Sequence, residues 1–90
     1  MGGSRDREHA IAWFLSAADH GDAHAALNMG IVLSDAEASE SDHVAAATWY
    51  EIARQRGLDP GQAMTVLTAR LTEEQTAAAR RNALAWLSIH

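Results

Sequence analysis

Hydrophobic side chains recur at helical spacing along most of this chain of 90 residues. In the stretch AIAWFLSAADHGD, residues 10–22, the apolar side chains fall at i, i+3, i+4 and i+7. That spacing places them on one face of an α-helix, and it returns further along the chain. No segment shows the alternation of apolar and polar residues that indicates a half-buried strand. The pattern therefore predicts an all-α protein.

Turn and capping signals divide the pattern into five helices. Gly21 and Gly57 each come one position past the end of a helix, where a positive φ is common and glycine is favoured. Thr72 and Gln75 have the spacing of a capping box at the start of the last helix. The predicted helices cover about residues 5–20, 23–33, 43–56, 60–70 and 73 onward. Their expected caps are Asp22, Ser41 or Asp42, Asp59 before Pro60, and Thr72.

One set of five residues occurs twice, and the middle of the set recurs a third time with nearly the same spacing. The second set follows the first by 36 positions, and the third follows the second by 37. Alanines at these positions let neighbouring helix axes approach, and the aromatic side chains fill the space between stacked hairpins, so we predict that the whole set packs. The sets are Ala10, Trp13, Phe14, Ala17 and Gly21; Ala46, Trp49, Tyr50, Ala53 and Gly57; and Ala83, Trp86 and Leu87.

The repeat defines the expected architecture. Two helix-turn-helix units, at about residues 6–41 and 42–71, are followed by a single helix at about 73–90. Two hairpins closed by one helix are a common end of a stacked helical array. We expect a short α-α solenoid of two repeats plus a C-terminal capping helix. It forms one domain over residues 5–90, with residues 1–4 as a flexible N-terminus or an expression remnant.

Composition limits the core and the classes of partner. An apolar content of 48% in so short a chain predicts one small core, and without cysteine there are no disulfides or thiolate metal sites. The net charge of −5 argues against a nucleic-acid surface, which is normally basic. No apolar run is long enough to span a membrane, and the first residues lack the hydrophobic segment of a secretory signal. The expected location is cytoplasmic, with neither nucleic acid nor membrane as a partner.

The charge is distributed unevenly along the chain. Residues 1–53 contain nine acidic residues and two arginines, a net charge of −7. Residues 54–90 contain three acidic residues and five arginines, a net charge of +2. Such asymmetry influences association rather than the fold.

The residues of the repeat resemble a known family. The stretch AIAWFLSAADHGDAHAALNMGIVL is similar to the unit of Sel-one-like repeats, a branch of the tetratricopeptide-like helical repeats. DHVAAATWYEIARQRG resembles the first helix of a second unit, and LTEEQTAAARRNALAW resembles the closing helix of many bacterial members. PGQAMTVLTARL departs from the pattern because it lacks the Asn and Gly of NMG, so it is expected to be a specialised end piece. The resemblance implies a scaffold for protein–protein contact, often regulatory, and it implies no common catalytic residue.

Few residues combine into a candidate chemical site. His20, Asp22 and His24 are residue types that bind zinc, but the two histidines belong to different helices and no further ligand is indicated. Glu73 and Glu74 begin a helix, where negative charge favours the helix dipole. We therefore predict no catalytic residue, no metal site, no cofactor and no enzyme activity. A small metal-dependent enzyme is the alternative, and bound zinc would support it.

The expected function is that of a non-enzymatic adaptor whose partner is another protein. Ile11, Leu15 and Ala18 extend the apolar surface of the first helix beyond the repeated stripe, although the first helix of an array normally has a polar outer face. Asn28 has an amide that can bond either a partner's backbone or a neighbouring loop. These four residues are the candidate interface. Self-association is the open alternative, in which the partner is a second copy and the chain is an oligomerisation module.

Overall fold

The computed structural model describes residues 3–34 and 39–90, with side chains from residue 8 onward, and shows five helices and no strand in these ranges. The all-α fold class is therefore confirmed. The helices are α1 (Gly3–Asp19), α2 (Ala23–Leu33), α3 (Glu40–Gln55), α4 (Gln62–Thr68) and α5 (Glu73–Leu87).

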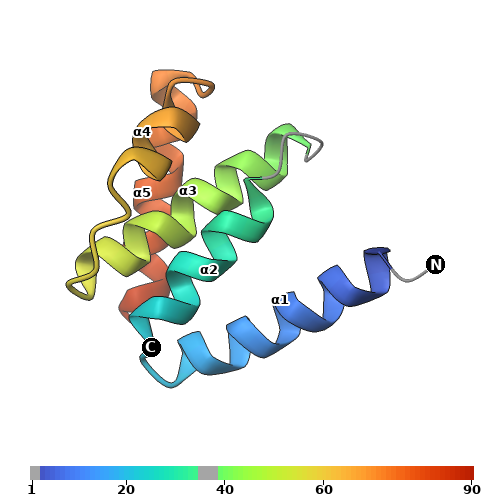
Figure 1. Cartoon of the computed structure of the whole chain (residues 1–90). Coiled ribbons are helices and arrows are strands. Elements are labelled where there is room, and N and C mark those ends of the chain that lie inside the picture. Colours follow the sequence, from blue (N-terminus) through green and yellow to red (C-terminus); the bar gives the residue numbers. More distant parts are fainter. Residues whose placement is uncertain (1–2, 35–38) are drawn as a thin grey trace.

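Helix α3 is the centre of the molecule, as Figure 1 shows. It packs against α2 on one side and crosses α5 on the other, and it has a smaller contact with α4. Helix α1 packs on α2 and diverges from the other helices (Figure 1). This succession of neighbours fits a small helical repeat-like arrangement.

The two predicted glycine turns have the same geometry. Gly21 has a φ of 92° and Gly57 a φ of 94°, as the sequence predicted. After each glycine the next backbone N–H donates to a carbonyl five residues back, from Asp22 to Ala17 at 3.2 Å and from Leu58 to Ala53 at 2.9 Å. Because both turns are Schellman-type helix ends, the offset of 36 seen in the sequence is also present in the backbone.

Two predicted caps are confirmed by side-chain hydrogen bonds. Asp22 Oδ1 accepts from the backbone N–H of His24 at 2.9 Å, which caps α2. Thr72 and Gln75 form the reciprocal pair of a capping box, so α5 begins at Glu73.

Two other predicted helix starts are wrong, and α1 begins slightly earlier than its approximate predicted start. Helix α1 already includes Gly3 and Ser4, and α3 begins at Glu40 because Ser39 is its cap, with Ser39 Oγ accepting from Asp42 N at 3.1 Å. Asp59 does not cap α4. Its Oδ1 accepts from Gly61 N at 2.9 Å, which forms a turn, and α4 starts beyond Pro60.

The centre of the core is the contact between α2 and α3. Tyr50 and Ile52 are the largest fully buried side chains. The ring of Tyr50 lies against Gly30 of α2. The predicted packing residues Ala46, Ala53 and Ala83 are also fully buried. The repeat therefore predicted correctly these buried small residues of α3 and α5.

The prediction that all three tryptophans pack is wrong for Trp13. Trp49 and Trp86 meet edge to face with ring centroids 5.1 Å apart, and both are half-buried. Trp13 is 76% exposed, because α1 packs on α2 through its other side, where Ala18 is fully buried and Phe14 contacts the core. Ala10, Ala17 and Leu87 are half-buried.

Side-chain contacts of Arg56 and His90 join the end of α1 to the rest of the fold. Arg56 Nη1 donates to the carbonyl of Ala18 at 2.8 Å, and its guanidinium lies 5.0 Å from the centre of the Trp86 ring. The His90 ring also stacks on that ring, with centroids 3.8 Å apart, and His90 Nε2 lies 3.2 Å from Asp19 Oδ1. These contacts connect the end of α1 to α3 and to the end of α5.

Candidate functional site: a cleft between α3, α4 and α5

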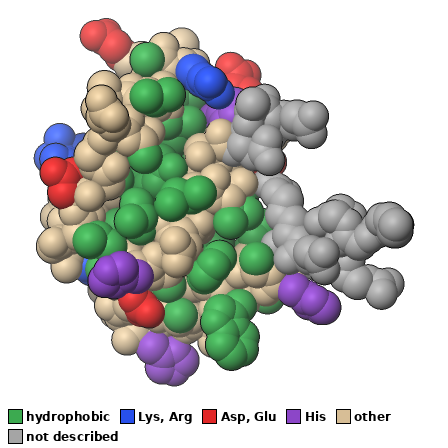
Figure 2. All heavy atoms as spheres, in the orientation of Figure 1, with side chains coloured by type: hydrophobic (Ala, Val, Ile, Leu, Met, Phe, Trp, Pro, Cys, Tyr) green, Lys and Arg blue, Asp and Glu red, His purple; other side chains and the backbone are tan. Residues whose placement is uncertain are grey.

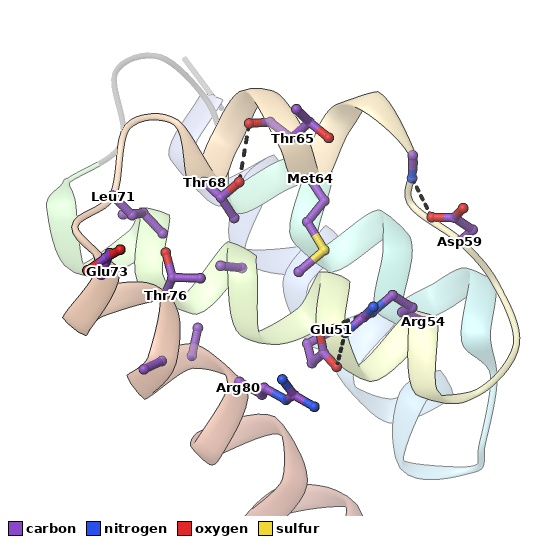
Figure 3. A pocket seen from close by; sticks show the side chains of 14 residues that line it. Glu51, Arg54, Asp59, Met64, Thr65, Thr68, Leu71, Glu73, Thr76 and Arg80 are labelled. Carbon is purple, nitrogen blue, oxygen red and sulfur yellow. Dashed lines mark hydrogen bonds and ion pairs between the residues drawn. The ribbon is translucent and has the colours of Figure 1, made fainter.

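A cleft of about 690 Å³ opens where α4 lies apart from α5 on one side of α3. Figure 3 shows side chains from all three helices around it. Its lining comprises Ala47, Glu51, Arg54, Asp59, Gly61, Met64, Thr65, Thr68, Leu71, Glu73, Thr76, Ala77, Ala79 and Arg80. This volume lies within the range of small-ligand sites.

The floor of the cleft is apolar and continuous with the core. Ala47 and Ala79 are buried members of the main core cluster, and Met64 and Leu71 pack against that cluster while remaining partly exposed. Thr76 is half-buried beside them on α5. An apolar side chain of a ligand in the cleft would therefore displace water from hydrophobic surface, which favours binding.

Glu51 is a buried carboxylate in the wall of the cleft. Its side chain is only 3% exposed, and Arg54 Nη2 donates to both of its oxygens at 2.8 Å. Arg54 Nε donates to Oε1 at 3.2 Å, and Gln55 Nε2 donates to Oε2 at 2.8 Å. The carboxylate is thus held by donors from the next turn of its own helix.

The electrostatic balance keeps Glu51 ionised. Burial by itself raises the pKa of the carboxyl. The hydrogen bonds from Arg54 and Gln55, together with the positive charges of Arg54 and Arg80, have the larger combined effect, so the pKa of Glu51 lies below its ordinary value. The same bonds raise the pKa of Arg54.

Two guanidinium groups, those of Arg54 and Arg80, lie at the end of the cleft that contains Glu51. Arg54 is anchored by Glu51 but keeps about half of its side chain exposed, at 49%. Arg80 comes from α5 on the opposite wall, is exposed, and lies near enough for its charge to lower the pKa of Glu51. Asp59 also lines the cleft and lies near enough to Arg54 for its charge to raise the pKa of Arg54, so two carboxylates balance the two guanidinium groups at this end. Glu73 lines the cleft near the start of α5 and places a further carboxylate away from the guanidinium groups.

The sequence pattern did not predict this site. The sequence contains one sign of the site: Glu51 is followed three residues later by Arg54, on the helical face that also carries Ala47. On a lone helix that pair is an ordinary surface ion pair. Only the crossing of α5 over α3 turns it into a buried carboxylate in a cleft wall.

The interface predicted from α1 is not one exposed surface. Ala18 is fully buried, and Ile11 is half-buried and packs against the main core cluster, so the prediction is wrong for both. They lie on the side of α1 that packs on α2. Leu15 is partly exposed, at 39%, and Asn28 is half-buried on α2; neither lines the cleft. Their role in binding stays a prediction.

The three residues with zinc-binding side chains serve the α1–α2 turn. The His20 ring nitrogen Nδ1 bonds the carbonyl of Ser16 at 2.8 Å, and Asp22 is occupied as the cap of α2. His24 is 3.9 Å from Asp22 and mostly exposed. Among the described side chains no group of three or more His, Asp or Glu converges in the way that a bound metal needs.

Comparison with protein-family models finds no match, and neither does comparison with curated proteins or with solved structures. The likeness to Sel-one-like repeats therefore rests on the residues of this chain alone. No helix within the described ranges has both the length and the apolar character to cross a membrane.

Proposed function

We propose that this chain is a non-enzymatic adaptor, acting in the cytoplasm, that binds a short segment of another protein in the cleft between α3, α4 and α5. The observation that carries the proposal is the combination of an apolar floor with two guanidinium groups at one end. Helical repeats commonly bind partners on concave surfaces of this kind. The repeat seen in the sequence supports the same class of function.

The chemistry of the cleft suggests which segment would fit. Met64 and Leu71 offer apolar surface for one or two aliphatic side chains. Arg54 and Arg80 offer N–H donors to a carboxylate at one end, and Glu51 holds the Arg54 side chain in place so that less rotamer entropy is lost on binding. The expected partner segment therefore carries an aliphatic residue next to an acidic one.

Selection from a library of displayed random peptides tests the proposal. Peptides selected on the wild-type chain are measured again by fluorescence anisotropy on two variants of α5. Ala77→Trp puts a bulky ring into the cleft, whereas Ala85→Trp adds the same ring at an exposed position outside it. We expect binding to fall roughly tenfold or more with Ala77→Trp and to persist with Ala85→Trp. Equal binding to both variants, or selection of no peptide, would contradict the proposal.

A second pair of variants tests the contribution of the guanidinium groups. Arg80→Gln removes a guanidinium that lines the cleft, and Arg81→Gln removes its exposed neighbour that does not. The selected peptides should be enriched in Asp and Glu and should lose affinity with Arg80→Gln alone. If the selected peptides lack acidic residues and bind both variants equally, the guanidinium groups do not contribute to binding. The proposed contact with the apolar floor would then remain.

A further inference from the structure

Helix α4 is packed along one narrow stripe. Of its seven residues only Leu67 is buried, at 3% exposure, and it belongs to the main core cluster. Its neighbour Val66 is 58% exposed, but Figure 2 shows hydrophobic side chains spread over the drawn face, so exposure by itself is not informative. The informative feature is that α4 has a cavity on each side.

Two different faces of α4 border these two cavities. The face that carries Met64 and Thr68 borders the cleft of about 690 Å³ that separates α4 from α5. The face that carries Ala63 and Val66 borders a second cavity of about 280 Å³, which lies between α4 and Tyr50. Folded chains are normally packed without such spaces beside a helix. Helix α4 therefore has room to move toward either side.

Hydrogen bonds hold α4 to itself and not to its neighbours. Thr68 Oγ1 donates to the carbonyl of Thr65 at 3.2 Å, and in the described part of the chain no hydrogen bond or ion pair of residues 62–68 reaches another helix. The helix begins without a side-chain cap, and its first bond, from Thr65 N to the carbonyl of Gly61, is 3.4 Å long. Because the contact of α4 with α3 is small, a shift of α4 breaks few interactions.

The chain is fixed on both sides of α4, with a short turn at each end of the helix. Pro60 is buried just before it, and Thr72 starts α5 in a capping box. Gly61, with a φ of 60°, separates Pro60 from α4, and residues 69–71 form the turn into α5. Hinges are commonly a few residues at the ends of an element, where φ and ψ can change. Gly61 and the 69–71 turn are in such positions, with Leu67 as the pivot between them.

We propose that α4 is a lid that pivots about Leu67 and closes on the segment held in the cleft. The inference rests on the proposed function. Movement of α4 toward α5 narrows the cleft and brings Met64 onto the bound segment, while the second cavity widens. Met64 is partly exposed in this structure, so covering its apolar surface favours closure. The free chain is expected to sample both positions of α4, and the bound segment shifts the population toward the closed one.

Spin labels test the movement, because a chain without cysteine accepts them at chosen positions. Ala63→Cys on α4 with Ala85→Cys on α5 reports the position of the lid. Ile31→Cys on α2 with Ala85→Cys is the control pair, and all three positions are exposed and outside the cleft. Pulsed electron spin resonance of the free full chain should give a clearly broader distribution of distances for α4–α5 than for α2–α5. Distributions of equal width would overturn the inference.

A peptide selected on the wild-type chain tests the closure. At saturation it should shorten and narrow the α4–α5 distance and leave the α2–α5 distance unchanged. If the α4–α5 distance stays the same while fluorescence anisotropy reports binding, the inference is overturned and the proposed function holds. If no peptide is selected, the proposed function fails, whereas a broad α4–α5 distribution in the free chain would still support the pivoting helix.

Two neighbouring residues of α4 test the pivot. Leu67→Ala should broaden the α4–α5 distribution and weaken peptide binding roughly tenfold, because fewer molecules hold α4 in the competent position. Val66→Ala changes an exposed neighbour outside the cleft and should alter neither. Circular dichroism and the α2–α5 distance check the fold, and Leu67→Val makes the same comparison with a smaller loss of volume if Leu67→Ala loses its helices. The same α4–α5 distribution at both positions would overturn the inference.

Discussion

The ring of Tyr50 occupies the space into which any side chain at Gly30 would project. A Cβ built at Gly30 overlaps two ring carbons of Tyr50, so α2 can approach α3 this closely only because that position has no side chain. The Tyr50 hydroxyl then lies 3.3 Å from Ser34 Oγ at the end of α2. One glycine and one aromatic residue thus determine how the two central helices pack.

Gly30→Ala is expected to destabilise the protein, although alanine is the better helix former. Overpacking of a well-packed core costs about 1 to 3 kcal/mol, which exceeds the gain in helix propensity of about 1 kcal/mol. Chemical denaturation should show a lower free energy of unfolding. In a Tyr50→Leu background the added methyl group should cost less, and an equal cost in both backgrounds would contradict the packing argument.

The three equivalent tryptophans should differ in their contribution to stability. Trp49→Ala removes a side chain that contacts both core clusters and Trp86, so we expect a cost near the lower end of about 3 to 5 kcal/mol. Trp13→Ala removes an exposed side chain and should change the unfolding free energy by no more than about 0.5 kcal/mol in the monomer. Thermal unfolding at low protein concentration compares them. Similar losses of stability for both variants would show that the Trp13 side chain is packed against other residues and not exposed.

The features that could be predicted from the sequence are those that depend on neighbouring residues. Gly21 and Gly57 end helices by their own backbone freedom, and Thr72 with Gln75 closes a capping box within one turn. The buried alanines followed from helical spacing, because only one face of each helix can be covered.

The features that could not be predicted depend on where distant helices lie. Trp13 has the same place in the repeat as Trp49, but its burial depends on a neighbouring helix that α1 does not have on that side. The cleft depends on the separation of α4 from α5, and no local pattern encodes that distance. Ser39 replaced the expected caps because Ser, Asp and Asn are nearly equal at a helix start, and this segment contains several of them.

Gly57 is expected to resist replacement by residues with a β-carbon, for a reason different from that at Gly30. No atom lies close to a Cβ placed at Gly57, so the cost comes only from its φ of 94°. Gly57→Ala should lower the free energy of unfolding by about 1 to 2 kcal/mol, and Gly57→Asn should cost less because asparagine tolerates this conformation. Urea denaturation of the two variants provides the measurement. An alanine variant as stable as the asparagine variant would show that the turn relaxes.

The buried pair in the cleft makes stability depend on pH. The pKa of Glu51 is lower in the folded chain than its ordinary value of 4.5, so its contribution is fully present above that value and is lost as the pH falls through the lowered pKa. Glu51→Gln should reduce the unfolding free energy near neutral pH by about 1 to 2 kcal/mol, because charge-assisted bonds are lost while solvent still reaches Arg54. The variant should also lose less stability on acidification than the wild type. Urea denaturation from neutral to acidic pH measures both effects, with Glu74→Gln as the control that removes an exposed carboxyl outside the cleft. If wild type and Glu51→Gln lost stability in parallel as the pH fell, the ion pair with Arg54 would not be the group that titrates.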